Sequence, residues 1–224
     1  MHRSGQPGVP SVATLSSLRA NGRLPRLRAY NEPMTAPFPQ PQSLAGHFLI
    51  AMPSLAEPPF SRGVAFVCQH DEDGAVGLLV NQLSEYRLGD VLSQMKLECN
   101  DLEVSDAPVL IGGPVQQERG FVLHREHGHW ESSYRINPDW SVTTSRDILV
   151  AMAKGEGPRL AVMALGYAGW SAGQLEQELK DNTWLTAEAS ERVVFHTPLE
   201  ERWSAAAGLV GVDPLQLPGY AGHA

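Results

Sequence analysis

Residues 63–81 read GVAFVCQHDEDGAVGLLVN, which is the clearest structural signal in the chain. Two apolar runs, 63–69 and 75–81, contain the β-branched residues that favour strands, and the polar segment 70–74 separates them. An Asp-Gly pair between two such runs is typical of a β-hairpin whose glycine has a positive φ. The sequence therefore predicts an antiparallel hairpin with Gly74 in its turn.

On both sides of this hairpin, further strands and helices are predicted in irregular alternation. Apolar spacing and capping motifs predict helices at 88–97, 145–154, 172–180 and 198–209. Strands are expected at 47–52, 109–112, 120–124, 134–136, 141–143, 159–165 and 193–196. This pattern indicates a single compact α+β domain with a mixed, largely antiparallel sheet and about four helices. Because strands separate the predicted helices, no helix-turn-helix is expected.

The charge of the chain is unevenly distributed. Residues 1–43 contain five arginines, one acid and seven of the 17 prolines, for a net charge of +4. The whole chain of 224 residues carries −8, so the remainder carries −12. Nucleic-acid binding depends on contacts between cations and phosphates, and direct binding is therefore not expected of such an acidic body.

The composition also suggests where the domain begins. Residues 1–43 lack apolar periodicity, which is typical of a disordered tail, and they are similar in composition to an organelle transit peptide. A third interpretation takes Met34 as the true start of the protein. In each case we expect residues 44–224 to form the domain and residues 34–224 to fold unaided.

Two cysteines, Cys68 and Cys99, lack the CxxC spacing of redox and metal motifs. Cys68 lies in an apolar run, so an inert buried thiol is expected there. No apolar run reaches the ~18 residues that a membrane helix needs. A reduced, cytoplasmic setting without a membrane span is therefore predicted.

Nine short segments carry a family resemblance. They are LAGHFLIAMP (44–53), HDEDGAVGLLVN (70–81), GGPV (112–115), GFVLH (120–124), TTSRDIL (143–149), ALGYAGWSAGQL (164–175), NTWL (182–185), FHTP (195–198) and GHA (222–224). In this order they resemble the bacterial AlgH/YqgE family. The resemblance implies a compact cytosolic α+β domain whose molecular activity is not established. Some members carry a transcription-regulator label historically linked to alginate production, and the family offers no catalytic residue or cofactor.

The pentapeptide GWSAG (169–173) matches the GxSxG motif of hydrolases, in which a strand-to-helix turn exposes a nucleophilic serine. Asp181 and His196 follow Ser171 in the order Ser, Asp, His. Few residues remain after Ser171 to build a hydrolase sheet, and the strand is expected to end at Gly166, before the serine. The resemblance adds that many family members have glycine at this position. We therefore interpret Ser171 as a helix N-cap.

The same segment is a candidate binding loop. Its glycines permit close approach to a backbone, the following helix start offers free N–H groups, and Tyr167 and Trp170 can wall a cleft for a small anionic or planar ligand. The alternative is a tight connection with both aromatic side chains packed in the core. The candidate cleft residues are Asn81, Gly112, Gly113, Gly166, Tyr167, Gly169, Trp170, Ser171 and Gln174.

Neither a metal nor a cofactor is expected. His124, His127 and His129 lack a neighbouring cysteine or carboxylate pair that would complete a familiar ligand set. The acids beside His70 lack EF-hand spacing and are interpreted as a solvated hairpin turn. Trp203 is expected in the core, whereas an exposed Trp203 would mark a partner surface.

The leading functional interpretation is a regulatory or binding protein that acts through a metabolite or a protein partner. The alternative is an enzyme of unknown reaction, a hydrolase or small-group transferase, using the cleft near 166–175. A structural assembly protein is a third class. An enzyme needs titratable groups that converge in its pocket, and their presence distinguishes the first two classes.

Overall fold

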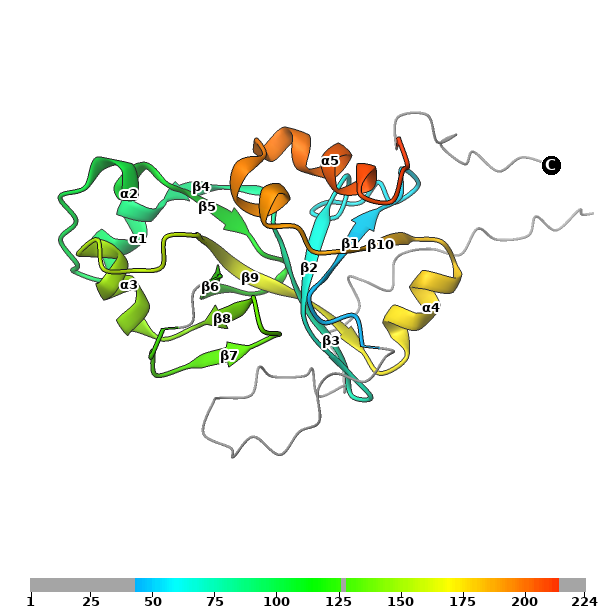
Figure 1. Ribbon diagram of the computed structural model, residues 1–224, viewed down its shortest axis with the longest axis horizontal. Helices are drawn as coiled ribbons and strands as arrows, with labels where there is room; N and C mark the ends of the chain where they lie inside the picture. The colour runs from blue at the N-terminus through cyan, green and yellow to red at the C-terminus, as the bar shows by residue number, and fades with distance from the viewer. Residues whose placement is uncertain (1–42, 126–127, 214–224) are drawn as a thin grey trace, which may run out of the picture.

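The computed structural model describes residues 43–125 and 128–213 (Figure 1). Its strands are β1 (His47–Ala51), β2 (Val64–Asp71), β3 (Gly74–Leu79), β4 (Leu83–Arg87), β5 (Pro108–Ile111), β6 (Val115–His124), β7 (Ser133–Arg135), β8 (Ser141–Thr143), β9 (Ala161–Ser171) and β10 (Trp184–Glu188). Its helices are α1 (Leu88–Gln94), α2 (Leu102–Asp106), α3 (Arg146–Ala153), α4 (Gln174–Lys180) and α5 (Arg202–Gly208). A π-helical turn η2 (Arg192–His196) and a 3-10 turn η3 (Leu199–Glu201) precede α5. The expected tail, residues 1–43, lies outside this part of the chain except for Ser43.

The strands form one curled sheet in the order β10-β1-β2-β3-β9-β6-β8-β7, with β5 on β9 and β4 on β5. The pairing of β5 with β9 is parallel, and the other described pairs are antiparallel. The long strand β9 joins the two halves, because its first half pairs with β5 and β6 and its second half with β3 (Figure 1). The predicted single α+β domain with a largely antiparallel sheet is confirmed.

The predicted hairpin is formed by β2 and β3, and its glycine has the expected left-handed conformation. Gly74 has φ +128°, and a Cβ placed on it would lie 2.1 Å from the carbonyl oxygen of Trp170. Alternate residues of the neighbouring β1 enter two different core clusters, Phe48 on one face of the sheet and Leu49 on the other. Helix α5 covers the first face and α4 the second, so these strands are apolar throughout.

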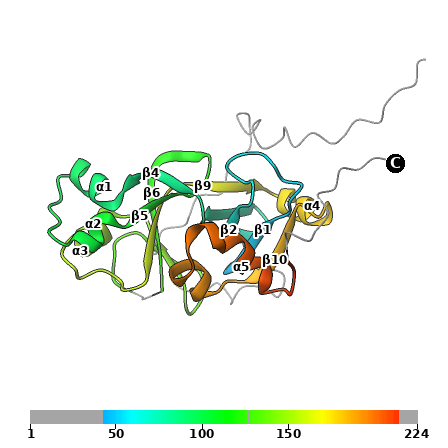
Figure 2. The ribbon, with the colours of Figure 1, turned by 90° about the horizontal axis from the view of Figure 1, so that it is seen from above.

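Most of the helices lie at the two ends of the sheet. Helices α1, α2 and α3 lie at one end and α4 at the other, whereas α5 lies over β1 and β2 between them (Figures 1 and 2). A third core cluster, which includes Leu92, Ile148 and Met163, fills the space between α1, α3 and the sheet. None of the described helices has the length and hydrophobicity needed to cross a bilayer.

Three predictions about individual strands and helices are wrong. The strand expected at 193–196 is the π-helical turn η2, because a four-residue apolar run has too little periodicity to separate helix from strand. The strand expected to end at Gly166 continues to Ser171, because Ala168 and Gly169 pair with β3. Helices α1 and α2 follow one another without an intervening strand, contrary to the expectation that strands separate all helices.

Candidate functional site

The two aromatic residues of the predicted cleft are core residues. Tyr167 and Trp170 are 6% and 1% exposed and belong to different core clusters. The indole nitrogen of Trp170 donates to Glu178 of α4. Both aromatic side chains therefore pack in the core, as in the alternative interpretation of this segment, and they do not line a cleft there. Their segment is strand rather than loop because it continues β9.

The polar residues of the predicted cleft, Asn81, Ser171 and Gln174, form local hydrogen bonds at the ends of strands and helices. The Asn81 side chain accepts the N–H of Val64 at 2.8 Å and donates to the carbonyl of Arg62 at 2.8 Å. The Ser171 hydroxyl and N–H both donate to Gln174 Oε1, but the helix N-cap is Gly173, so the predicted N-cap at Ser171 is wrong. Neither of these two Ser171 hydrogen bonds involves a histidine, and Nε2 of His196 instead lies 3.5 Å from Oε1 of Glu191.

The predicted glycines bring the β5–β6 turn directly against β9. A Cβ on Gly113 would lie 2.1 Å from the carbonyl carbon of Tyr167, and a Cβ on Gly166 would lie 2.5 Å from the oxygen of Gly113. Both residues have a positive φ, +156° and +72°. Close packing here fixes where β6 begins, and the first residues of β6 form one wall of the pocket described next.

The β6 strand carries a polar bulge opposite β9. Val115 pairs with Tyr167 but Gly120 pairs with Leu165, so the residues between them have no matching partners in β9. Gln116, within this bulge, has a left-handed φ of +50° that is unusual for a residue other than glycine. Bulges of this kind redirect side chains and are frequent beside functional sites. This one presents the exposed residues 117–119 to a pocket.

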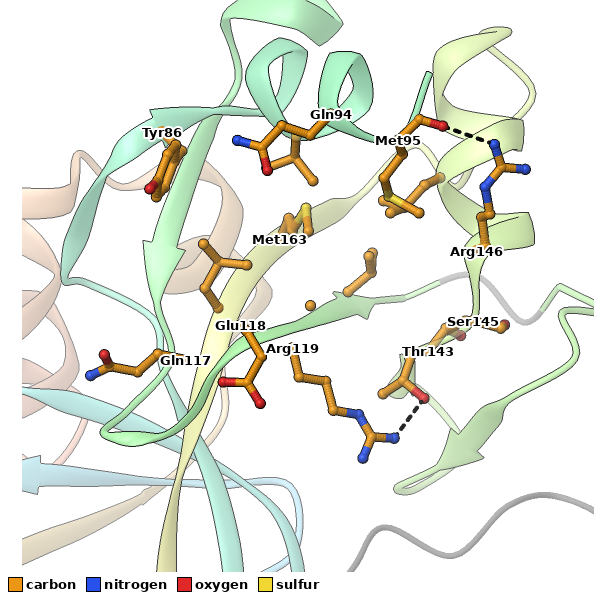
Figure 3. A pocket seen from close by; sticks show the side chains of 16 residues that line it. Tyr86, Gln94, Met95, Gln117, Glu118, Arg119, Thr143, Ser145, Arg146 and Met163 are labelled. Carbon is orange, nitrogen blue, oxygen red and sulfur yellow. Dashed lines mark hydrogen bonds between the residues drawn. The ribbon is translucent and has the colours of Figure 1, made fainter. Parts of the chain in front are cut away.

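The pocket lies between α1, α3 and the β6–β9 part of the sheet and has a volume of about 620 Å³ (Figure 3). This volume is within the range of ~300–1,000 Å³ that is typical of small-molecule sites. Its apolar floor consists of Val91, Met95, Val122, Leu149, Met163 and Leu165. None of the nine predicted cleft residues lines it.

Polar side chains form the rim of the pocket, among them two arginines. Arg119 lies on the β6 bulge and donates to the Thr144 hydroxyl at 3.4 Å, with its guanidinium 5.4 Å from the centre of the Phe121 ring. Arg146, at the start of α3, donates to the carbonyl of Met95 at 3.0 Å. Figure 3 shows both guanidinium groups at the periphery of the pocket and Met163 near its middle.

The histidines do not assemble a metal site in the part of the chain that is described. His124 is buried, and its Nε2 lies 2.9 Å from the Thr143 hydroxyl. His127 lies outside the described residues. His70 accepts the Leu44 N–H at Nδ1 and lies 2.7 Å from Glu176 through Nε2. Among the described residues, no group of three or more His, Cys, Asp or Glu side chains is placed to hold a metal ion.

Three groups with shifted pKa values lie away from the pocket. Burial raises the pKa of Cys68 well above its ordinary range, which agrees with an inert thiol. Burial lowers the pKa of Arg202 to about 10. Burial alone would raise the pKa of Glu176, but hydrogen bonds from its own N–H and from His70, with the nearby charges of His70 and Lys180, lower it overall.

Trp203 is 5% exposed and donates from its indole nitrogen to the carbonyl of Ala51 at 2.8 Å. Its expected place in the core is therefore confirmed, and it does not provide a partner surface.

Sequence reasoning missed the pocket residues, including Met95, Arg119, Arg146 and Met163. One signal was available: the four polar residues 116–119 interrupt a segment that is otherwise typical of a strand. The remaining lining residues come from five separate elements, and only the tertiary structure brings them together.

These features define an α+β domain with a curled mixed sheet and an open pocket at its three-helix end. The profile of the DUF179 (AlgH-like) family matches residues 48–215, and the chain belongs to this family. A UPF0301 protein of Xanthomonas campestris pv. campestris (strain B100) is 56% identical over 184 residues, which is 82% of this chain and 98% of that protein. A UPF0301 protein of Stenotrophomonas maltophilia (strain K279a) is 55% identical over 183 residues, 82% of this chain and 97% of that protein.

Two solved structures have the same fold. The solution structure of the AlgH protein from Pseudomonas aeruginosa has a TM-score of 0.68 and 43% identity, and the match covers 84% of this chain and all of that one. A crystal structure of a Corynebacterium diphtheriae protein has a TM-score of 0.60 with 21% identity, over 77% of this chain and 90% of that one. At that identity the second match supports the fold alone.

Proposed function

We propose that the protein is a cytoplasmic regulatory protein that binds a small molecule in the pocket between α1, α3 and β6. The observation that carries this proposal is the pocket itself, which combines an apolar floor with a polar rim at a volume suited to a metabolite. The regulatory effect would then pass from the bound molecule to a protein partner, without direct contact to DNA.

The floor is incompletely covered, which favours a ligand. Val91, Met95 and Leu165 belong to the third core cluster but are only partly buried. Burial of apolar surface contributes roughly 25 cal/mol per Å², so a molecule seated here gains binding free energy from surface that the protein leaves in contact with water. Methionine side chains adapt their shape to a ligand more readily than branched ones.

The chemistry of the lining favours binding over catalysis. Glu118 is the one carboxylate among the described residues that line the pocket, and neither histidine nor cysteine lines it. General acid–base or nucleophilic catalysis relies on a nucleophile or base with a second group that orients it. The arrangement therefore supports a binding protein over the hydrolase or transferase alternative.

The charge of the adjacent helices argues against DNA contact. Although α1 and α2 are consecutive, residues 88–106 contain five carboxylates and one lysine. Helix α2 has five residues, and its N-cap is Asp101. A recognition helix needs cations near the phosphates and enough length to follow the major groove.

The proposal is tested by thermal unfolding of the full chain against a panel of neutral, anionic and cationic metabolites. A ligand at ~100 times its Kd should stabilise the protein by about 2.7 kcal/mol. Met95→Trp, which fills the half-buried floor from the end of α1, should abolish that stabilisation. Leu102→Trp, on α2 at a residue that is 78% exposed and outside the pocket, is the matched control and should retain it.

Stabilising ligands that are insensitive to Met95→Trp would place binding elsewhere, and a panel without any stabilising ligand would contradict the proposal. Duplex DNA in the same assay should have no effect at physiological salt. Tight, steeply salt-dependent DNA binding would instead support the DNA-contact class.

A further inference from the structure

Neither arginine on the rim has a carboxylate partner within the described part of the chain. The ion pairs of the described residues involve His70, Arg125 and His196, and neither Arg119 nor Arg146 takes part in one. Each guanidinium makes one hydrogen bond to the described residues, through Nη2. A guanidinium has five N–H donors, so several remain for a ligand at each residue.

The presence of two arginines in the pocket lining contrasts with the abundance of acidic residues elsewhere in the domain. The chain after residue 43 carries −12, and Glu118 is the one carboxylate among the described residues of the lining. Two cations and one anion give the lining a net positive charge of one. The acidic surroundings disfavour anions in general, so an anion that binds here does so through one of these two arginines.

The pocket also separates polar from apolar surface. The floor is formed by aliphatic and thioether side chains, whereas Arg119 and Arg146 lie at its periphery (Figure 3), and Thr144 adds a hydroxyl to the lining. Guanidinium and hydroxyl groups donate hydrogen bonds to carboxylate or phosphate oxygens. An apolar chain attached to such a head group would lie on Met95 and Met163.

We infer that the pocket binds an amphipathic anion, with a carboxylate or phosphate-ester head held by an arginine of the rim, Arg119 or Arg146, and an apolar tail on the methionine floor. This inference rests on the proposed function and names the ligand class of the same site. An amphipathic cation is disfavoured because only Glu118 would receive its head group.

The test is isothermal titration calorimetry of the full chain with four probes that share one tail: octanoate, octyl phosphate, octanamide and octylamine. At least one of the two anions should bind ~10-fold or more tightly than octanamide, because hydrogen bonds to charged groups are about twice as strong as neutral ones. Octylamine should bind no better than octanamide. Comparison of octanoate with octyl phosphate identifies the head group.

Variants then assign the head group to its residues. Either Arg119→Gln or Arg146→Gln should reduce affinity for the preferred anion ~5-fold or more and leave octanamide binding unchanged, and unchanged affinity in both variants would overturn the assignment. Arg135→Gln is the matched control, because Arg135 is exposed on β7, forms no ion pair among the described residues and does not line the pocket. Met95→Trp should reduce binding of both the anions and octanamide.

The outcomes separate the two proposals. Equal affinity for octanoate, octyl phosphate and octanamide, all lost in Met95→Trp, would overturn the anion class and leave the binding pocket intact. The same holds if none of the four probes binds while a metabolite stabilises the protein in a Met95-dependent way. Absence of any Met95-dependent ligand would overturn the proposed function itself.

Discussion

The indole nitrogen of Trp170 lies 2.8 Å from Oε2 of Glu178, which ties the end of β9 to the middle of α4. The same oxygen accepts the indole N–H of Trp184 at 2.8 Å, and Gln174 donates to Oε1 of this carboxylate at 3.0 Å. Helix α4 is thereby joined to two strands, β9 and β10, that do not pair with each other. A tryptophan that the sequence offers as a ligand wall is thus a structural residue with a defined partner.

Loss of the shared carboxylate should destabilise the protein strongly. Glu178→Leu leaves the N–H groups of two buried indoles without their acceptor, and each such group costs ~1–3 kcal/mol, so a loss of about 2 kcal/mol or more is expected. Glu178→Gln keeps a carbonyl acceptor and should cost less. Urea unfolding followed by tryptophan fluorescence measures both, and Glu188→Leu, at an exposed carboxylate on β10, is the control. Equal stability of Glu178→Leu and Glu188→Leu would contradict this role.

A pair of glycines with nearly equal φ isolates the effect of close packing. Gly166 and Gly155 have φ values of +72° and +73°, but a Cβ would meet the Gly113 oxygen at 2.5 Å in the first case and nothing within 4 Å in the second. Gly155→Ala should cost ~1–2 kcal/mol from the left-handed backbone alone. Gly166→Ala should cost ~1–3 kcal/mol more because of the clash. Similar unfolding free energies for both variants would show that the β5–β6 turn can move away.

The stability of the protein should fall at acidic pH partly through Glu176. Its pKa is lowered in the folded protein, so its contribution is present above the unfolded pKa of ~4.3 and is lost as the pH falls through the folded value. Because the Glu176 side chain is 45% exposed, solvent screens its interaction with His70 and the effect should be below about 1 kcal/mol. Urea midpoints between pH 3 and 7 should decline less steeply in Glu176→Gln. An unchanged slope would contradict the contribution, with Glu188→Gln as the control.

The two cysteines should differ in reactivity. Burial places the Cys68 thiol away from reagents and raises its pKa, whereas Cys99 is half-buried. A disulfide reagent such as DTNB should modify one thiol per chain under native conditions and two in denaturant. Cys99→Ser should abolish the native reaction. Rapid native modification of that variant would show that the β2 region opens readily.

Much of the fold follows from local sequence, but the pocket does not. Gly74 and its flanking apolar runs identify the hairpin because turn chemistry and strand periodicity act over a few residues. Trp203 is correctly placed in the core by its helical spacing. The apolar run at η2 does not distinguish helix from strand, because Val193 and Val194 are β-branched and buried, which is compatible with either structure.

Arg119 and Arg146 show why the pocket could not be predicted from the sequence. They are far apart in the chain and line the same pocket only because β6 pairs with β9 and α3 packs against that pair. The sequence-predicted Gly113 and Gly166 do contribute, but indirectly, by allowing the turn that starts β6. Local sequence patterns thus predict the glycines that position β6 beside the pocket, but not the residues that line the pocket.

The central place of β9 also bears on how the protein emerges from the ribosome. Strands β3, β5 and β6 all pair with β9, yet they precede it in the chain by tens of residues. Until residues 161–171 have been synthesised, these three strands each lack a neighbour, and unpaired strand edges are prone to associate with other chains. The nascent chain therefore passes through a stage of exposed edges that ends only when one late strand joins the two halves.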